Sequence, residues 1–479
     1  MNLTPQIFKS KLSLAILSGL LLVLAWPPIS LTPLLFVAFV PLLYVLNELK
    51  SSKKVFLYSY LAFFIWTLGT MYWIGNARVG GRGYLVMSMA WLLIPLFQCF
   101  PIMVFYWVRK YWKSANWMVL PLIWVAYEYL HSQWDLAFTW LHLGFGLTPS
   151  PFFIQFYKIT GYLGGSLILM YINVFVVLML INYKKASVKK YVISTAMLIA
   201  LLLIGNFLIK PSKIASSRNA KIAIVQLSQD PYTVLEKKTV WKAVTQAEEA
   251  LKDLPEDVDL VVFPEGFVKS SPAAPIVFNN PDSDSVILAL KRISRKIKAP
   301  ILTGFIGFKL FRPDQAPSNA LPTGDGAYFS GYNGAMLISH DQPTQIQTKR
   351  HLVPFMERVP FLEYFSYFEN FRLGLNQMMG SYGKSSSSKI LKYKQLRIAP
   401  FICLDGLFPA DGGTFVDQRA NLVAVITNDG WAGNTSGYRQ NSSYATSLAV
   451  SLNRSVVRAA ATGISRFIDI SGKSHGEVQ

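Results

Sequence analysis

Seven runs of mostly apolar residues fill the first 210 positions of this chain. A helix needs about 20 such residues to cross a bilayer. Seven runs in succession argue against the buried helices of a soluble protein and against a cleaved signal peptide. We therefore predict a membrane bundle of about seven helices over residues 1–210. The runs cover residues 12–28, 31–46, 55–74, 84–108, 117–130, 159–181 and 191–209.

The composition supports this prediction. The chain of 479 residues is 52% hydrophobic and only 15% charged, whereas soluble domains average about 25% charged residues. These fractions exclude a disordered chain and an ordinary soluble enzyme. Its formal net charge of +20 does not indicate a nucleic-acid partner, because residues 1–210 hold 16 Lys or Arg against three acidic residues, mostly between the apolar runs.

The basic residues also predict an orientation. If the N-terminus is cytoplasmic, the cytoplasmic segments contain 12 Lys or Arg residues and the opposite loops contain three. Positively charged loops favour the cytoplasmic side. Seven spans would then place everything after residue 210 outside the cytoplasm, which in a bacterium with two membranes is the periplasm.

After a linker at 211–219, residues 220–479 have the pattern of a water-soluble α/β domain. Strands are predicted at 221–227, 259–264, 300–307, 335–339, 396–402 and 422–427, and helices at 239–254, 285–297 and 438–461. Alternating strands and helices favour a layered α/β sandwich. The Ser-rich segment 380–389 is predicted to be a flexible loop.

Three reactive side chains stand at or near the ends of predicted strands: Glu265, Lys349 and Cys403. Taken singly, Glu265 is more often a solvated loop acid, Lys349 a surface residue and Cys403 a small buried hydrophobe. An unpaired thiol outside the cytoplasm is exposed to oxidation, so the presence of Cys403 there calls for a functional explanation. The other cysteine, Cys99, lies inside the fourth apolar run and is not expected to reach it.

Together these three residue types make chemical sense. A carboxylate can take the proton of a thiol, which then becomes a nucleophile. A nearby ammonium stabilises the thiolate and the oxyanion of a tetrahedral intermediate. The combination predicts acyl transfer through a thioester, with no metal ion or cofactor required.

The motifs around these residues resemble the nitrilase, or carbon–nitrogen hydrolase, superfamily. They are PEG at 264–266, K-x-HLVPF-x-E-x-VP at 349–360, the strand end at Cys403 and TNDGW at 427–431. The resemblance implies an α-β-β-α sandwich. In the membrane half, WPP at 26–28, LTPLLFVAFVPLL at 31–43, EYL at 128–130 and FTWLHLGF at 138–145 resemble the bacterial apolipoprotein N-acyltransferase family.

This resemblance assigns roles residue by residue. Glu265 would be the general base, Lys349 the lysine of the triad and Cys403 the acylated nucleophile. Glu357 would be a second active-site glutamate, and Trp140 would help to line the lipid entrance.

The family resemblance implies a two-step reaction. Cys403 would take an acyl chain from a phospholipid, typically phosphatidylethanolamine, and pass it to the N-terminal amine of a diacylglyceryl-cysteine lipoprotein. Two alternatives remain: a membrane-tethered amidase or nitrilase, and a non-catalytic lipoprotein-binding paralogue. The second is motivated by Cys-Leu-Asp at 403–405, where Cys-Tyr-Glu is usual, and by the expectation that the usual C-terminal strands and last helix are lacking.

Overall fold

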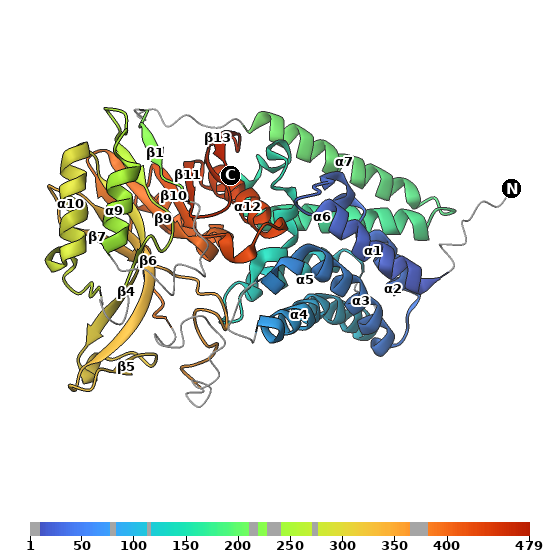
Figure 1. Cartoon of the computed structure of the whole chain (residues 1–479). Coiled ribbons are helices and arrows are strands. Elements are labelled where there is room, and N and C mark those ends of the chain that lie inside the picture. Colours follow the sequence, from blue (N-terminus) through green and yellow to red (C-terminus); the bar gives the residue numbers. More distant parts are fainter. Residues whose placement is uncertain are drawn as a thin grey trace. The chain divides into compact units, whose positions relative to one another are not determined.

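The computed structural model describes residues 10–76, 83–112, 116–209, 219–227, 241–270, 276–364 and 382–479. Lys9, Arg78, Arg82, Lys113 and most of the linker at 211–219 lie outside these residues. The chain divides into two compact units (Figure 1). The first contains Met1–Ala77, Gly83–Lys210 and Thr435–Ser451, and the second contains Arg78–Arg82, Pro211–Asn434 and Leu452–Gln479.

The first unit is built from helices. They are α1 (Lys11–Ala25), α2 (Val40–Glu48), α3 (Ser52–Met71), α4 (Gly83–Tyr111), α5 (Val119–His131), α6 (Tyr157–Ile181), α7 (Val188–Leu208) and α12 (Ser436–Leu452). Short 3₁₀ turns connect several of them.

Four helical segments in the described part of the chain are long and apolar enough to cross a membrane: Ser52–Asn76, Met87–Tyr111, Tyr157–Ile181 and Val188–Leu208. The other three predicted runs form shorter apolar helices. Pro27 and Pro28 follow the end of α1, and the run after them is split into a 3₁₀ turn and α2. The chain is therefore a membrane protein with several apolar helices, although fewer than seven reach a full spanning length.

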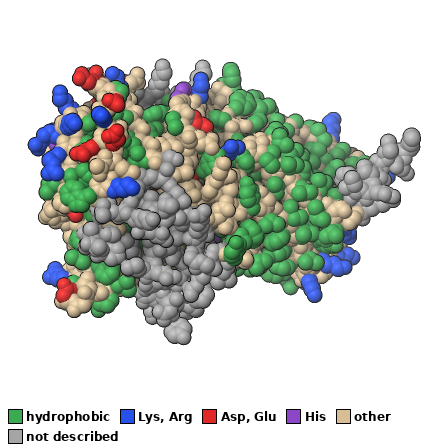
Figure 2. All heavy atoms as spheres, viewed as in Figure 1, with side chains coloured by type: hydrophobic (Ala, Val, Ile, Leu, Met, Phe, Trp, Pro, Cys, Tyr) green, Lys and Arg blue, Asp and Glu red, His purple; other side chains and the backbone are tan. Residues whose placement is uncertain are grey.

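Apolar side chains cover much of the face of this unit that Figure 2 shows. On α7, Met197, Leu201 and Phe207 are 66%, 64% and 75% exposed. Contiguous apolar surface of this kind is rare on soluble monomers. It fits contact with lipid acyl chains.

Helix α12 belongs to the first unit although it follows residue 210 by more than 200 positions. Its Gln440 is fully buried and uses its whole amide group. The oxygen accepts hydrogen bonds from Trp73 Nε1 (3.0 Å) and Trp140 Nε1 (2.8 Å). The nitrogen donates to the carbonyl oxygens of Pro27 (2.8 Å) and Thr70 (2.9 Å). An amide has two donors and two acceptor sites, so none is left unpaired.

The second unit contains two sheets. The first has the order β1-β2-β4-β6-β5, with β3 beside β4 and β7 beside β6. Its strands are β1 (Ile222–Ile224), β2 (Leu260–Val262), β3 (Val268–Lys269), β4 (Ile301–Phe311), β5 (Leu321–Pro322), β6 (Tyr328–Ile338) and β7 (Gln345–Thr348).

The second sheet has the order β13-β12-β11-β10-β9-β8. Its strands are β8 (Leu391–Tyr393), β9 (Leu396–Ile402), β10 (Leu422–Thr427), β11 (Ser455–Ala460), β12 (Ser465–Ile468) and β13 (Ser474–Val478). The helices of this unit are α9 (Trp241–Ala250), α10 (Ser285–Ile297) and α11 (Gly412–Asp417).

Strand alternation explains the layers. In β2, Leu260 and Val262 pack in the core that joins the two sheets, whereas Val261 packs in the core beneath α9 and α10. Successive side chains of a strand point to opposite faces, so an uninterrupted apolar run fills both cores. On the second sheet, Phe401 of β9 contacts Phe415 of α11 at 5.5 Å between ring centroids. The predicted helical membrane region and the layered α/β domain are confirmed.

The predicted helix at 438–461 is wrong in its last third. Helix α12 ends at Leu452, Asn453 adopts a positive φ of 50°, and β11 follows as a parallel neighbour of β10. The β-branched Val456 and Val457 favour a strand, and pairing with β10 outweighs the helix propensity of the neighbouring alanines. Strands β12 and β13, which the sequence did not predict, extend the sheet beyond β11.

Candidate active site

Strand directions bring Glu265 and Lys349 to one edge of the first sheet. Strand β2 is parallel to β4, β4 is antiparallel to β6, and β6 is antiparallel to β7. The strands β2 and β7 therefore run the same way. Glu265 stands three residues after β2 ends, and Lys349 directly follows β7.

The backbone at Glu265 lies very close to β4. A Cβ atom on Gly304 would be 2.5 Å from Glu265 Cα and 2.6 Å from Gly266 N. Real Cβ contacts are not this short, so only glycine fits at position 304. Gly266 itself has a φ of +60°, which turns the chain just after the carboxylate.

The Glu265 carboxylate is held on both oxygens. Oε1 accepts a hydrogen bond from Asn333 Nδ2 (2.7 Å) and lies 3.4 Å from Lys349 Nζ. Oε2 accepts a hydrogen bond from the backbone N–H of Asn428 (3.0 Å). These contacts fix the position of the carboxylate while its side chain keeps 11% exposure.

Lys349 is only 1% exposed and lies between two carboxylates. Its Nζ is 2.8 Å from Glu357 Oε1 in addition to its contact with Glu265. Burial by itself lowers the pKa of this ammonium, but Glu357, Glu265 and Cys403 raise the pKa well above its ordinary value. Lys349 is therefore a permanent positive charge at this site.

Cys403 sits where β9 passes into a 3₁₀ turn, Cys403–Leu407. Its φ of +49° is uncommon for a residue other than glycine and is typical of strained positions at functional sites. Burial raises the pKa of its thiol, and Glu265 raises it further, whereas Lys349 lowers it. The resting sulfur is thus a protonated thiol at neutral pH, and it needs a base to become a nucleophile.

Asn333, in the middle of β6, connects the two glutamates. Its Nδ2 donates to Glu265 Oε1 at 2.7 Å and to Glu357 Oε1 at 3.1 Å. Its backbone oxygen accepts the N–H of Lys349 at 2.8 Å. The sequence analysis did not identify this positioning residue. The signal that could have indicated it is a polar amide side chain within a strand of mostly buried residues.

Residues 221–477, more than half of the chain, match the family described as Carbon-nitrogen hydrolase. The chain belongs to the carbon–nitrogen hydrolase family. Residues 18–175 match the apolipoprotein N-acyltransferase N-terminal domain. The resemblance that the motifs indicated in both halves is confirmed.

Several relatives resemble the chain over nearly its whole length. An apolipoprotein N-acyltransferase of Chlorobaculum tepidum is 28% identical, over 97% of this chain and 87% of its own. One of Geobacter metallireducens is 26% identical, over 97% and 86%. Among solved structures, Saccharomyces cerevisiae Nit3 covers 56% of this chain and 88% of its own, with 21% identity and a TM-score of 0.37.

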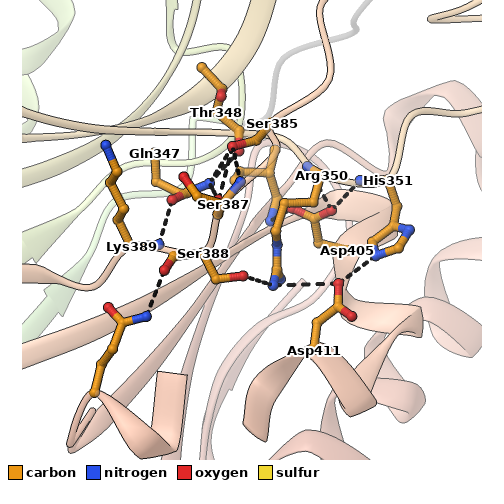
Figure 3. Close-up of polar contacts among 12 residues, drawn as sticks. Gln347, Thr348, Arg350, His351, Ser385, Ser387, Ser388, Lys389, Asp405 and Asp411 are labelled. Carbon is orange, nitrogen blue, oxygen red and sulfur yellow. Dashed lines mark hydrogen bonds and ion pairs between the residues drawn. The ribbon is translucent and has the colours of Figure 1, made fainter. Parts of the chain in front are cut away.

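Asp405 stands where the chain departs from the expected Cys-Tyr-Glu sequence. Its buried Oδ1 accepts hydrogen bonds from the backbone N–H groups of Arg350 (3.2 Å) and His351 (2.8 Å) (Figure 3). Its Oδ2 accepts a hydrogen bond from the backbone N–H of Ile402 (3.2 Å). One carboxylate thus ties the residues that follow Lys349 to the residue that precedes Cys403. The Cys-Leu-Asp variation therefore still places a carboxylate two residues after Cys403.

We predict that Asp405→Ala destabilises the second unit strongly. The change would leave three backbone N–H groups without an acceptor, and each unpaired buried donor costs about 1–3 kcal/mol. Asp405→Asn keeps one acceptor oxygen and should lie between Ala and the parent chain. The thermal unfolding temperature of the purified chain measures this, with the exposed Asp417→Ala as the control. Equal unfolding temperatures for all variants would contradict the role assigned to Asp405.

A serine-rich loop is fastened beside this junction (Figure 3). Gln347 Nε2 donates to Ser385 Oγ (3.2 Å) and to the carbonyl oxygen of Ser387 (2.9 Å). Arg350 Nη1 donates to Ser388 Oγ at 2.8 Å. Specific hydrogen bonds therefore hold the described part of the predicted flexible loop at 380–389. Residues 380 and 381 lie outside the described part.

A buried ion pair supports the TNDGW turn. Arg458 of β11 is fully buried, and its Nη2 lies 2.7 Å from Asp429 Oδ2. Thr427 Oγ1 donates to Asp429 Oδ1 at 2.9 Å. The turn positions the Asn428 N–H that binds Glu265. Sequence reasoning missed Arg458 because its strand was predicted as a helix.

Trp140 lies in the first unit and is 3% exposed. Besides binding Gln440, its ring lies 4.8 Å from that of Trp73 and stacks on Phe138 at 5.9 Å between centroids. Its expected part in lining a lipid entrance stays a prediction. Among the described residues, no group of three or more His, Cys, Asp or Glu side chains could hold a metal ion.

Proposed function

We propose that the chain is an apolipoprotein N-acyltransferase in which Cys403 carries the acyl group. The observation that supports this most is the buried Lys349 ammonium, held between Glu265 and Glu357 and electrostatically coupled to the Cys403 thiol. The match of residues 18–175 to the N-terminal domain of that enzyme supports the same function for the membrane region.

In the first step, Glu265 accepts the thiol proton while Cys403 Sγ attacks an ester carbonyl of a phospholipid. The Lys349 ammonium stabilises the oxyanion of the tetrahedral intermediate. Its collapse breaks the ester C–O bond and forms the thioester. The lysophospholipid oxygen leaves with the proton that Glu265 had taken.

In the second step, the N-terminal amine of a diacylglyceryl-cysteine lipoprotein attacks the thioester carbonyl. Glu265 accepts a proton from this amine and returns it to the departing Cys403 sulfur. An amide is formed and the thiol is regenerated. Glu357 helps to hold Lys349 in place during both steps. We propose phosphatidylethanolamine as the acyl donor.

A membrane-tethered amidase would use the same three residues on a soluble amide. Supplying the purified chain with a phospholipid radiolabelled in its acyl chain distinguishes the two functions. The N-acyltransferase gives label on Cys403 that a synthetic diacylglyceryl-cysteine peptide then removes as labelled amide. Label released only as free fatty acid, with the peptide present, would rule out the acyltransferase. Failure of any label to bind would favour the non-catalytic alternative.

We further propose that the protein lies in a bacterial inner membrane with the second unit in the periplasm. The 12-to-3 distribution of basic residues between the two sides supports this orientation. A phosphatase reporter fused after residue 210, which is active only outside the cytoplasm, should be active. A fluorescent reporter that requires the cytoplasm should be dark at the same position, and the opposite pattern would overturn the proposed compartment.

A further inference from the structure

A cavity of about 270 Å³ opens in the first unit among the ends of α2, α3 and α4 and Trp117, which precedes α5. Its wall combines two kinds of side chain. Leu46, Val55 and Ile102 are buried and apolar, whereas Lys50, Arg109 and Lys110 supply three positive charges. Figure 2 shows Lys and Arg side chains gathered at the end of this unit where α2 lies.

Arg109 is the central feature of this cavity. Its guanidinium carbon lies 4.7 Å from the ring centroid of Trp117 and 5.6 Å from that of Phe105. Both rings are buried, and they contact each other at 5.1 Å. Contact with the two rings positions the guanidinium, and cation–π contacts of this kind do not use its five N–H donors.

No acceptor for those donors is found among the described residues. Throughout the described part of the chain, no hydrogen bond or ion pair joins Arg109 to another residue. No Asp or Glu is found in the described lining of the cavity, and Glu48 nearby in the sequence pairs with Lys11 at 3.1 Å. A half-buried charge without a partner is costly, so the site is complementary to an anion.

A hydrogen bond links two parts of the cavity wall. Tyr106 Oη donates to the carbonyl oxygen of Lys50 at 2.5 Å, which joins α4 to the segment between α2 and α3. The site lies at the start of α3, whereas Thr70, which binds Gln440, lies near its other end. A 20-residue helix is about 30 Å long. The cavity is thus remote from the end of α3 that contacts α12.

We propose that this cavity binds one phospholipid whose headgroup carries a net negative charge. The phosphate is held bidentately by Arg109, with Lys50 and Lys110 at the mouth, and an acyl chain lies along Leu46, Val55 and Ile102. Guanidinium forks match phosphate geometry, and basic pockets between membrane helices suit anionic headgroups. A zwitterionic lipid fits less well, because no described carboxylate in the lining receives its ammonium.

The test uses the full chain, purified in detergent and titrated with phosphatidylglycerol or phosphatidylcholine under native mass spectrometry. We expect one tightly retained phosphatidylglycerol per chain, with a preference of about tenfold over phosphatidylcholine, which is about 1.4 kcal/mol. Arg109→Gln should remove this preference, and Arg109→Lys should keep part of it. Lys185→Gln, an exposed basic residue outside the cavity, should change nothing.

Equal retention of phosphatidylglycerol by the parent chain and Arg109→Gln would overturn the proposal. So would displacement of the lipid by millimolar inorganic phosphate, which would make the site a phosphate site. If Arg109→Gln lowers the unfolding temperature in lipid-free detergent, its loss of binding could reflect misfolding. The variant Lys110→Gln, at an exposed position, is then used to test binding in its place. It should weaken phosphatidylglycerol binding a few-fold, and unchanged binding in that variant would equally overturn the proposal.

Discussion

Replacing Cys403 by Ser should abolish acyl-enzyme formation and lower turnover by about 10⁴-fold or more, as removal of a catalytic nucleophile does elsewhere. The hydroxyl occupies nearly the same volume as the thiol. It is a much weaker acid, so a carboxylate base cannot activate it under the same conditions. Incorporation of acyl-labelled phospholipid into the protein, followed by mass spectrometry of the peptide that contains residue 403, measures the effect.

The second cysteine provides the control for this experiment. Cys99 lies in α4 and is 1% exposed, and no hydrogen bond or ion pair of the described residues joins it to the reacting groups. Cys99→Ser should therefore retain activity close to that of the parent chain. Turnover near the parent level in Cys403→Ser would contradict the thioester mechanism, whatever the Cys99 variant does.

Lys349→Met should lower the rate of Cys403 acylation by about 10²–10³-fold, because the oxyanion loses its charged stabiliser. It should also destabilise the second unit. Glu265 and Glu357, which now share one ammonium at 3.4 and 2.8 Å, would face each other without it. Removing one partner of a buried ion pair typically costs about 3–5 kcal/mol.

Two further variants separate these effects. Lys349→Met combined with Glu357→Gln removes one of the two repelling carboxylates, so stability should recover while acylation stays slow. Lys291→Met breaks a partly exposed pair with Asp282, at 2.8 Å, and should change neither acylation nor stability by much. Acylation at the parent rate in Lys349→Met would remove this lysine from the mechanism.

Local patterns in the sequence were sufficient to predict much of this site. Pro-Glu-Gly follows one buried strand, and Cys403 follows another. The position of each reactive side chain at a strand end therefore follows from the local sequence alone. The positions of Glu265, Lys349 and Cys403 relative to strand ends could therefore be predicted. Glu357 depended on the motif alone, because no periodicity marks a loop residue as a partner of Lys349.

The interactions that hold these residues in place could not be predicted, because they join segments far apart in the sequence. Asn333 reaches Glu265 across 68 positions, and Asp405 reaches the amide of Arg350 across 55. The strand β11 was mistaken for helix for the same reason. Its alanines favour a helix locally, and only pairing with β10 decides otherwise.

The membership of α12 in the first unit has a consequence for biosynthesis. The ribosome completes α7 at Leu208, but the helix that supplies Gln440 follows more than 200 residues later. At about 5–20 residues per second, the early helices wait on the order of 10–50 s for it. During that time Gln440 is not yet available to the indole N–H groups of Trp73 and Trp140 or to the carbonyl of Thr70. The first helices to be synthesised therefore reach their final state among the last, and a nascent chain arrested before residue 436 should be a substrate for membrane quality control.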